Sequence, residues 1–278
     1  IGIISEPNAH PQCSEELDGI EHPFVTAVLN GDVDNYADLS AGEDLRIAAE
    51  ITTDAKVIPT LMARRLGEGV DPASAFRETV ASLDGSVAIA AATVHAPDSL
   101  FLALRGSGQA VYVGLAEDAY IVASEPYGVV EETAHYVRMD GETPSDPDNP
   151  SGSRGQIIEL RAAGAGTLEG MRRWSYDGTP LELDDADVQT AQVTTRDIDR
   201  GEFPHFLLKE ITASPASFRK TLRGKLVEDA DGSMRVVLGP ETLPDEVRDG
   251  LVSSRIDRVL VIGQGTAAIA GQSLAHHL

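Results

Sequence analysis

The sequence predicts an α+β fold in which antiparallel strands follow a group of helices. Three observations support this class. An apolar run at residues 24–29 is typical of a buried strand, and helical spacing of apolar residues dominates positions 55–83. Between residues 85 and 161, short apolar stretches are separated by turn residues rather than by helices. Because short strands joined by tight turns pair antiparallel, we expect two sheets between helical layers.

The first element is the strand at residues 24–29, which runs into Asn30-Gly31. Gly tolerates a positive φ and Asn tolerates the left-handed region, so we expect the strand to stop there. One interpretation is a hairpin turn, for which Asn-Gly is a strong signal. The other is a strand end where the Asn30 amide and the Gly31 N–H point one way, as two neutral donors suited to an oxyanion. The dipeptide alone favours the turn.

Three helices are expected next, and each has a candidate N-cap. Asp34 can cap the first, Thr53 or Asp54 the second, and Asp71 the third, which has Pro72 at its first position. For Asp54, the residues alone favour the capping role over a ligand-binding role. The expected helices span residues 34–39, 55–66 and 72–83.

The strands that follow are short and separated by turns rich in Gly, Pro and Asp. They are expected at residues 85–94, 100–104, 110–115, 120–123, 133–139 and 156–161. The Pro-, Ser- and Asp-rich residues 140–154 predict a loop, and residues 174–178 predict a hairpin. Arg105, which precedes Gly-Ser-Gly, suits a substrate carboxylate, but a surface turn is the favoured interpretation.

The last third of the chain has a different pattern. Residues 203–226 predict a linker with helical character, residues 229–234 a hairpin tip, and residues 244–251 a helix. The apolar run 258–262 predicts a buried parallel-type strand, and a Gly-x-Gly turn and a small-residue helix follow it. This arrangement suits a phosphate at the helix N-terminus and fits the loose G-x-G-x-x-A dinucleotide fingerprint.

Composition excludes several classes of protein and site. The formal net charge of −23 argues against nucleic acid or an anionic membrane as a partner. No apolar run reaches the roughly 18 residues of a membrane helix. One cysteine, Cys13, excludes an internal disulfide framework and a zinc site of clustered cysteines, and it fits a reducing cytosol. Acidic neighbours disfavour its thiolate, so we interpret Cys13 as a bystander.

Seven short motifs occur in an order that resembles a known family. The resemblance is to the class II glutamine amidotransferases, and more closely to the glucosamine-6-phosphate synthases, which are isomerising glutamine–fructose-6-phosphate aminotransferases. It covers nearly the whole chain. The motifs are Asn8-Ala9-His10-Pro11, Asn30-Gly31 with Asn35-Tyr36, Thr53-Asp54 with Val57-Ile58, Leu83-Asp84-Gly85-Ser86, Arg105-Gly106-Ser107-Gly108, Ala123-Ser124-Glu125 and residues 203–211.

The resemblance implies a domain organisation. Residues 1–195 would form a four-layer αββα sandwich of the N-terminal-nucleophile hydrolase type, as a glutamine amidotransferase domain without its N-terminal part. Residues 196–250 would form an interdomain linker. Residues 251–278 would be the first strand and helix of an α/β sugar isomerase (SIS) domain. The chain is thus expected to be a piece of a longer protein.

The resemblance also implies roles for individual residues. Asn30 and Gly31 would stabilise the tetrahedral oxyanion, and Asp54 would pair with the α-ammonium of glutamine. His10 would be packed under the site, although a loop histidine before Pro11 is an equal alternative. Gly2 matches the Gly of the family's Thr-His-Gly segment, where Ile1 stands in place of His. Gly265 and Thr266 would face the sugar phosphate in the isomerase part.

The function implied is ammonia release from glutamine for transfer to a sugar phosphate, of the type that converts fructose 6-phosphate to glucosamine 6-phosphate. No cofactor and no metal are expected, the location would be the cytoplasm, and the parent protein would form a homodimer through its isomerase domain. The family's nucleophile, an N-terminal cysteine, would precede Ile1, so we expect no glutamine hydrolysis by this chain. Two alternatives remain: a catalytically degenerate module for glutamine sensing or assembly, and, more weakly, a dinucleotide-dependent enzyme.

Overall fold

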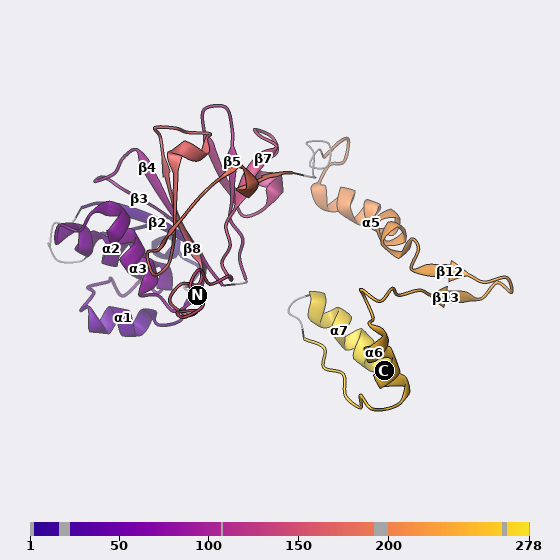
Figure 1. The fold of residues 1–278 in the computed structure, drawn as a ribbon. Coiled ribbons are helices and arrows are strands. Elements are labelled where there is room, and N and C mark those ends of the chain that lie inside the picture. The colour runs from indigo at the N-terminus through magenta and orange to yellow at the C-terminus, as the bar shows by residue number, and fades with distance from the viewer. Residues whose placement is uncertain (1–2, 17–22, 107, 192–199, 263–265, 278) are drawn as a thin grey trace. The chain divides into compact units, whose positions relative to one another are not determined.

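The computed structural model describes residues 3–16, 23–106, 108–191, 200–262 and 266–277. The chain divides into two compact units, Ile1–Asp199 and Arg200–Leu278 (Figure 1). The division falls four residues after the boundary that the sequence predicts at residue 195. The assignment of these units to an amidotransferase domain, a linker and an isomerase start stays a prediction.

The first unit contains two antiparallel sheets. The seven-stranded sheet has the order β1-β2-β3-β4-β8-β9-β10, and the four-stranded sheet has the order β11-β7-β5-β6. This arrangement confirms the α+β class. The strands are β1 (Gln12–Cys13), β2 (Val25–Val33), β3 (Gly85–Thr93), β4 (Ser99–Arg105), β5 (Tyr112–Leu115), β6 (Tyr120–Ala123), β7 (His135–Arg138), β8 (Gln156–Arg161), β9 (Met171–Ser175), β10 (Pro180–Leu181) and β11 (Val188–Thr190).

Helices pack on one face of the seven-stranded sheet. Ile58, Leu61 and Phe76 from the helices share a buried cluster with Ile89 of β3 and Phe101 of β4. Burial alternates along β3, as expected for a strand with one face in this core. The helices are α1 (Tyr36–Gly42), α2 (Val57–Gly67) and α3 (Pro72–Ala81), and the 3-10 turns are η1 (Glu6–Asn8), η2 (Asp54–Lys56), η3 (Pro126–Gly128), η4 (Leu168–Gly170) and η5 (Asp185–Asp187).

A second core joins the two sheets. Leu102 and Leu104 of β4 and Ile158 of β8 pack in one cluster with Val113 of β5 and Val137 of β7. On the other side of the four-stranded sheet, a Cβ on Gly114 would lie 3.0 Å from Val129 Cβ, so the segment after η3 covers that face. The described residues thus supply three of the four predicted layers.

The end of β2 and the cap of α1 differ from the sequence-based prediction. Strand β2 does not stop at Asn30-Gly31 but continues to Val33, in register with β3 down to Gly85. The N-cap position of α1 is Asn35 rather than Asp34. Asn35 bridges two segments instead of capping, because its Nδ2 donates to Ser82 O (3.0 Å) and its Oδ1 accepts from Asp84 N (2.9 Å).

The caps of the next two helices agree with the sequence. Thr53 is the N-cap of η2, where its Oγ1 accepts from Ala55 N at 3.4 Å, and α2 continues from η2. Asp71 caps α3 by accepting from Ser74 N at 3.1 Å, with Pro72 at the first helical position.

The second unit contains α5 (Phe206–Leu222), the hairpin β12 (Leu226–Glu228) and β13 (Met234–Val236), α6 (Asp245–Val252) and α7 (Thr266–His277). The predicted strand at residues 258–262 does not form, and Leu260 and Ile262 are 77% and 94% exposed. A parallel-type strand needs neighbouring strands for its N–H and C=O groups, and no described strand flanks this run. Of the predicted phosphate-side residues, Gly265 lies outside the described residues and Thr266 begins α7.

Within the described ranges, no helix is long and apolar enough to cross a bilayer. The same ranges contain no group of three or more His, Cys, Asp or Glu side chains that could hold a metal ion.

Candidate functional site

Gly31 lies within the β2–β3 ladder, two residues before the end of β2, opposite Val87, and Asn30 lies opposite Ala88. This position excludes the hairpin-turn interpretation. Gly31 has φ +128°, and a Cβ on it would lie 2.0 Å from the Ser86 carbonyl oxygen. Only glycine fits here, because the backbone conformation and the approach of β3 both exclude a side chain.

Asn30 and Gly31 line two different cavities rather than the single pocket that the sequence predicts. Gly31 lines a cavity of about 340 Å³ at the end of β2. Asn30 lines an apolar cavity of about 230 Å³, together with Ala88, Ala90 and Val111. Successive residues of a strand point to opposite faces of the sheet, which explains the separation. The roles of both residues as oxyanion donors stay predictions.

Asp54 lies beside Gly31, in the same cavity. Its Oδ2 accepts from the backbone N–H of Val33 at 2.7 Å, so a residue 21 positions away along the chain is fixed to the end of β2. Among the described residues, its Oδ1 has only a long contact of 3.5 Å with Thr53 Oγ1. Asp54 is 7% exposed. A carboxylate accepts about four hydrogen bonds, so this one retains acceptor capacity for a cation in the cavity.

Asn8 holds the other wall of the cavity, and sequence reasoning missed this role. Its Oδ1 accepts from the backbone N–H of Thr52 (2.7 Å) and of Thr53 (2.9 Å), and its Nδ2 donates to Glu50 O (3.1 Å). These bonds attach residues 5–10 to the segment that leads into Asp54. The motif Asn8-Ala9-His10-Pro11 marked Asn8 as a residue of interest, but nothing in the motif indicated hydrogen-bond partners more than 40 residues away.

The other predicted site residues are His10 and Gly2. His10 lines the Gly31 cavity and is exposed, so it is not packed beneath the site as expected. Gly2 lies outside the described residues. Ile3 and Ile4 line the cavity at its open side, with Ile3 69% exposed. The Ile3 N–H donates to Thr52 Oγ1 at 3.1 Å.

Lys56 anchors the base of this region. It is 3% exposed, and its Nζ donates to the carbonyl oxygens of Cys13 (2.5 Å) and Glu15 (2.8 Å). Burial lowers the pKa of the Lys56 ammonium, against the opposing effect of Cys13, Glu15 and Glu16. The contacts fasten β1 to the start of α2, so Lys56 supports the site without facing it.

Neither Cys13 nor Arg105 is positioned to act on a substrate in the Gly31 cavity. Cys13 pairs with Thr26 of β2, five residues before Gly31, which corresponds to about 17 Å along a strand. Arg105 donates to Ser151 O at 2.8 Å and stacks over the Tyr176 ring at 5.2 Å. Its guanidinium therefore has structural partners, and Arg105 is the half-buried last residue of β4 rather than part of the surface turn that the sequence favoured.

No protein-family model matches the chain. A glutamine–fructose-6-phosphate aminotransferase (isomerizing) of Halalkalibacterium halodurans is 27% identical over 270 residues, covering 97% of this chain and 38% of the relative. The corresponding enzyme of Sulfolobus acidocaldarius is 29% identical over 281 residues, covering 97% of this chain and 39% of the relative. The chain is similar to these aminotransferases along nearly its whole length. It spans 38–39% of the length of these two relatives.

Two solved structures are similar to part of the chain. The glutamine phosphoribosylpyrophosphate amidotransferase of B. subtilis, in complex with ADP and GMP, gives a TM-score of 0.45 at 19% identity, over 63% of this chain and 33% of that chain. An allosteric regulatory enzyme of purine biosynthesis gives a TM-score of 0.44 at 21% identity, over 61% of this chain and 31% of that chain.

Proposed function

We propose that the first unit is the glutamine-binding domain of an amidotransferase that passes ammonia to a sugar phosphate. The reaction would be the conversion of fructose 6-phosphate to glucosamine 6-phosphate, which matches the name of the relatives. The observation that carries the proposal is the Asp54 carboxylate, which lies nearly buried in the same cavity as Gly31.

Each site residue has a chemical role in this proposal. The carboxylate of Asp54 pairs with the α-ammonium of glutamine in a charge-assisted hydrogen bond. The N–H of Gly31 stabilises the oxyanion that forms at the glutamine amide, which is worth about 3–4 kcal/mol for one such donor. The Asn30 amide lines the other cavity, so we do not assign it this role. His10 borders the bound substrate, and Asn8 positions the wall on which it lies.

The nucleophile is not among the described residues near Gly31. Cys13 lies about 17 Å along the sheet from Gly31, too far to attack an amide carbon held there. The resemblance implies an N-terminal cysteine of the parent protein, with its own α-amine as base. We therefore assign glutamine binding and oxyanion stabilisation to this chain, and the attack itself to a residue outside it.

The second unit belongs to the same proposal. Residues 196–250 act as the linker, and residues 251–278 begin the sugar isomerase domain, in which Gly265 and Thr266 lie toward the phosphate. A homodimer through the isomerase domain and a cytoplasmic location complete the proposal. The resemblance supports these assignments, and the formal net charge of −23 argues against nucleic acid as a partner.

Calorimetric titration of the chain with glutamine tests the central role. Substituting Asp54→Asn keeps the size of the side chain and removes its charge, so we expect the Kd for glutamine to rise at least about tenfold. Asp118→Asn, in the exposed turn between β5 and β6, is the matched control and should leave the Kd unchanged.

A ligand series identifies the group that Asp54 recognises. Glutaramic acid has the same terminal amide as glutamine but lacks the α-ammonium. It should bind the wild-type chain and the Asp54→Asn variant equally weakly. If Asp54→Asn lowers affinity for glutaramic acid as much as for glutamine, the assigned ion pair is wrong.

A further inference from the structure

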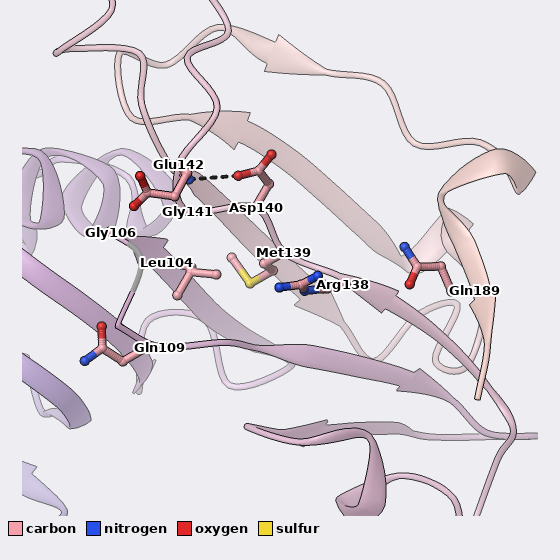
Figure 2. Close-up of a pocket in the computed structure, with 9 residues that line it drawn as sticks. All are labelled: Leu104, Gly106, Gln109, Arg138, Met139, Asp140, Gly141, Glu142 and Gln189. Atoms are coloured by element: carbon pink, nitrogen blue, oxygen red, sulfur yellow. Dashed lines mark hydrogen bonds between the residues drawn. The ribbon is translucent and has the colours of Figure 1, made fainter. Parts of the chain in front are cut away.

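The first unit has another polar cavity, of about 460 Å³, where the end of β4 meets the end of β7 (Figure 2). Its volume falls within the range of about 300–1,000 Å³ that is typical of small-molecule sites. The proposed glutamine site does not use it. The lining residues that determine its chemistry are Leu104, Gln109, Arg138, Met139, Glu142 and Gln189.

Opposite charges lie on two sides of an apolar floor. Leu104 and Met139, each 2% exposed, lie in the centre, with the Arg138 guanidinium to one side and the Glu142 carboxylate to the other (Figure 2). Among the described residues, neither head group has an ion-pair partner within 4.0 Å. The Arg138 guanidinium lies over the Tyr112 ring, 5.9 Å from its centre.

The walls of this cavity are held in place by the backbone. The Gly106 N–H donates to Gly141 O at 2.9 Å, which joins the β4 end to the turn after β7. Asp140 accepts from the N–H groups of Glu142 (2.8 Å) and Thr143 (3.0 Å). Burial raises the pKa of the Asp140 carboxyl, but the bonds from Thr143 and Glu142, together with the positive charge of Arg138, outweigh it, so the net shift is downward. The turn that presents Glu142 is therefore fixed and carries a second negative charge.

Two amide side chains complete the lining. Ser86 Oγ donates to Gln109 Oε1 at 2.6 Å, which fixes the Gln109 amide and leaves its NH₂ group to donate to a ligand. Gln189 of β11 lines the side beyond Arg138 (Figure 2). Amides in these positions suit hydroxyl groups, because an amide can both donate to and accept from a hydroxyl.

We propose that this cavity binds a small molecule that carries both an ammonium and a phosphate, of the amino sugar phosphate class. Arg138 holds the phosphate, Glu142 holds the ammonium, and the amides of Gln109 and Gln189 bind the hydroxyls. A phosphate alone meets repulsion from Glu142 and Asp140, and an amine alone meets repulsion from Arg138. The choice of ligand rests on the proposed function, because transfer of an amino group to fructose 6-phosphate yields a molecule of this class.

Calorimetric titration of the chain with D-glucosamine 6-phosphate tests the proposal. Glucose 6-phosphate, which lacks the ammonium, and glucosamine, which lacks the phosphate, should each bind at least about tenfold more weakly. Arg138→Gln and Glu142→Gln should each raise the Kd for D-glucosamine 6-phosphate about tenfold. Arg46→Gln and Glu132→Gln, at exposed positions away from the cavity, are matched controls and should leave it unchanged.

Three results would overturn the site: no binding of D-glucosamine 6-phosphate at millimolar concentration, equal binding of glucose 6-phosphate, or equal loss of affinity in the variants and the controls. Titration with glutamine keeps the two proposals separate, because glutamine binding depends on Asp54 in the other cavity. Glutamine binding without amino sugar phosphate binding refutes only the second site. If D-glucosamine 6-phosphate binds as expected while Asp54→Asn leaves glutamine affinity unchanged, only the glutamine site is refuted.

Discussion

Replacing Gly31 with alanine should destabilise the first unit more than the same change at Gly69 or Gly42. The new Cβ would lie 2.0 Å from the Ser86 carbonyl oxygen, whereas ordinary contact begins near 3.4 Å. Strand β3 would have to move by more than 1 Å at this point, or β2 would have to rotate out of the ladder. Either movement disturbs hydrogen bonds between the two strands on both sides of Asn30.

The expected loss can be estimated from two contributions. Holding an L-residue at φ +128° costs about 1–3 kcal/mol. Losing one or two ladder hydrogen bonds costs about 1 kcal/mol each. We therefore expect Gly31→Ala to lower the free energy of unfolding by about 2–5 kcal/mol.

Urea unfolding followed by tryptophan fluorescence measures this loss in the first unit alone. Trp174 in β9 is the only tryptophan of the chain, and it packs against the core beneath the helices. Two glycines provide controls. Gly69 has φ +88° with open space around it, so Gly69→Ala isolates the backbone cost of about 1–2 kcal/mol. Gly42 lies in α1 with open space, so Gly42→Ala should be neutral or stabilising.

The comparison of Gly31→Ala with Gly69→Ala tests whether close packing against Ser86 explains the glycine at position 31. Equal losses for Gly31→Ala and Gly69→Ala would show that the approach of Ser86 contributes nothing, and the explanation of Gly31 by close packing would be refuted. A larger loss at Gly31 with an unchanged Gly42→Ala supports it.

Three further predictions concern the site and the core. Asn8→Ala should lower stability by about 1–2 kcal/mol and weaken glutamine binding, and Asn8→Asp, which keeps the Oδ1 acceptor, should restore part of both in calorimetry. Burial raises the pKa of the Tyr176 phenol in the folded chain, so the unfolded chain loses this proton first as the pH rises. The free energy of unfolding should therefore fall as pH rises above about 10. Urea unfolding between about pH 8 and 11 should show a smaller fall for Tyr176→Phe than for the wild-type chain. The chain should release no glutamate from glutamine, and activity abolished by Cys13→Ala would show that the nucleophile is misassigned.

Tyr176→Phe also leads to a prediction about stability at pH 7. Its hydroxyl is fully buried and has no hydrogen-bond partner among the described residues. Removing an unsatisfied buried hydroxyl is expected to leave stability unchanged or raise it slightly. The ring contact with Arg105 persists in Tyr176→Phe, so a loss of more than about 1 kcal/mol at pH 7 would indicate a hidden partner of the hydroxyl.

The sequence predicted much of the first unit because its signals are local. Strands β6 (Tyr120–Ala123) and β8 (Gln156–Arg161) have the predicted boundaries, and α3 begins at Pro72 after the Asp71 cap. Each depends on alternation, a turn residue or a cap within a few positions. The contacts of Asn8 with Thr52 and Thr53 depend on how distant segments pack, and no local pattern encodes them.

The two largest errors have the same physical origin. Asn30-Gly31 was predicted to end a strand, and residues 258–262 to form one, each from a local pattern. Whether a residue belongs to a strand depends on the partner that receives its N–H and C=O groups. Beside Gly31 the segment Gly85–Val87 supplies that partner and comes close enough to exclude any side chain. Beside residues 258–262 no described strand does, and an apolar run stays exposed. Glycine at position 31 is thus required by the neighbouring strand rather than by a turn, and this is the distinction that Gly31→Ala and Gly69→Ala measure.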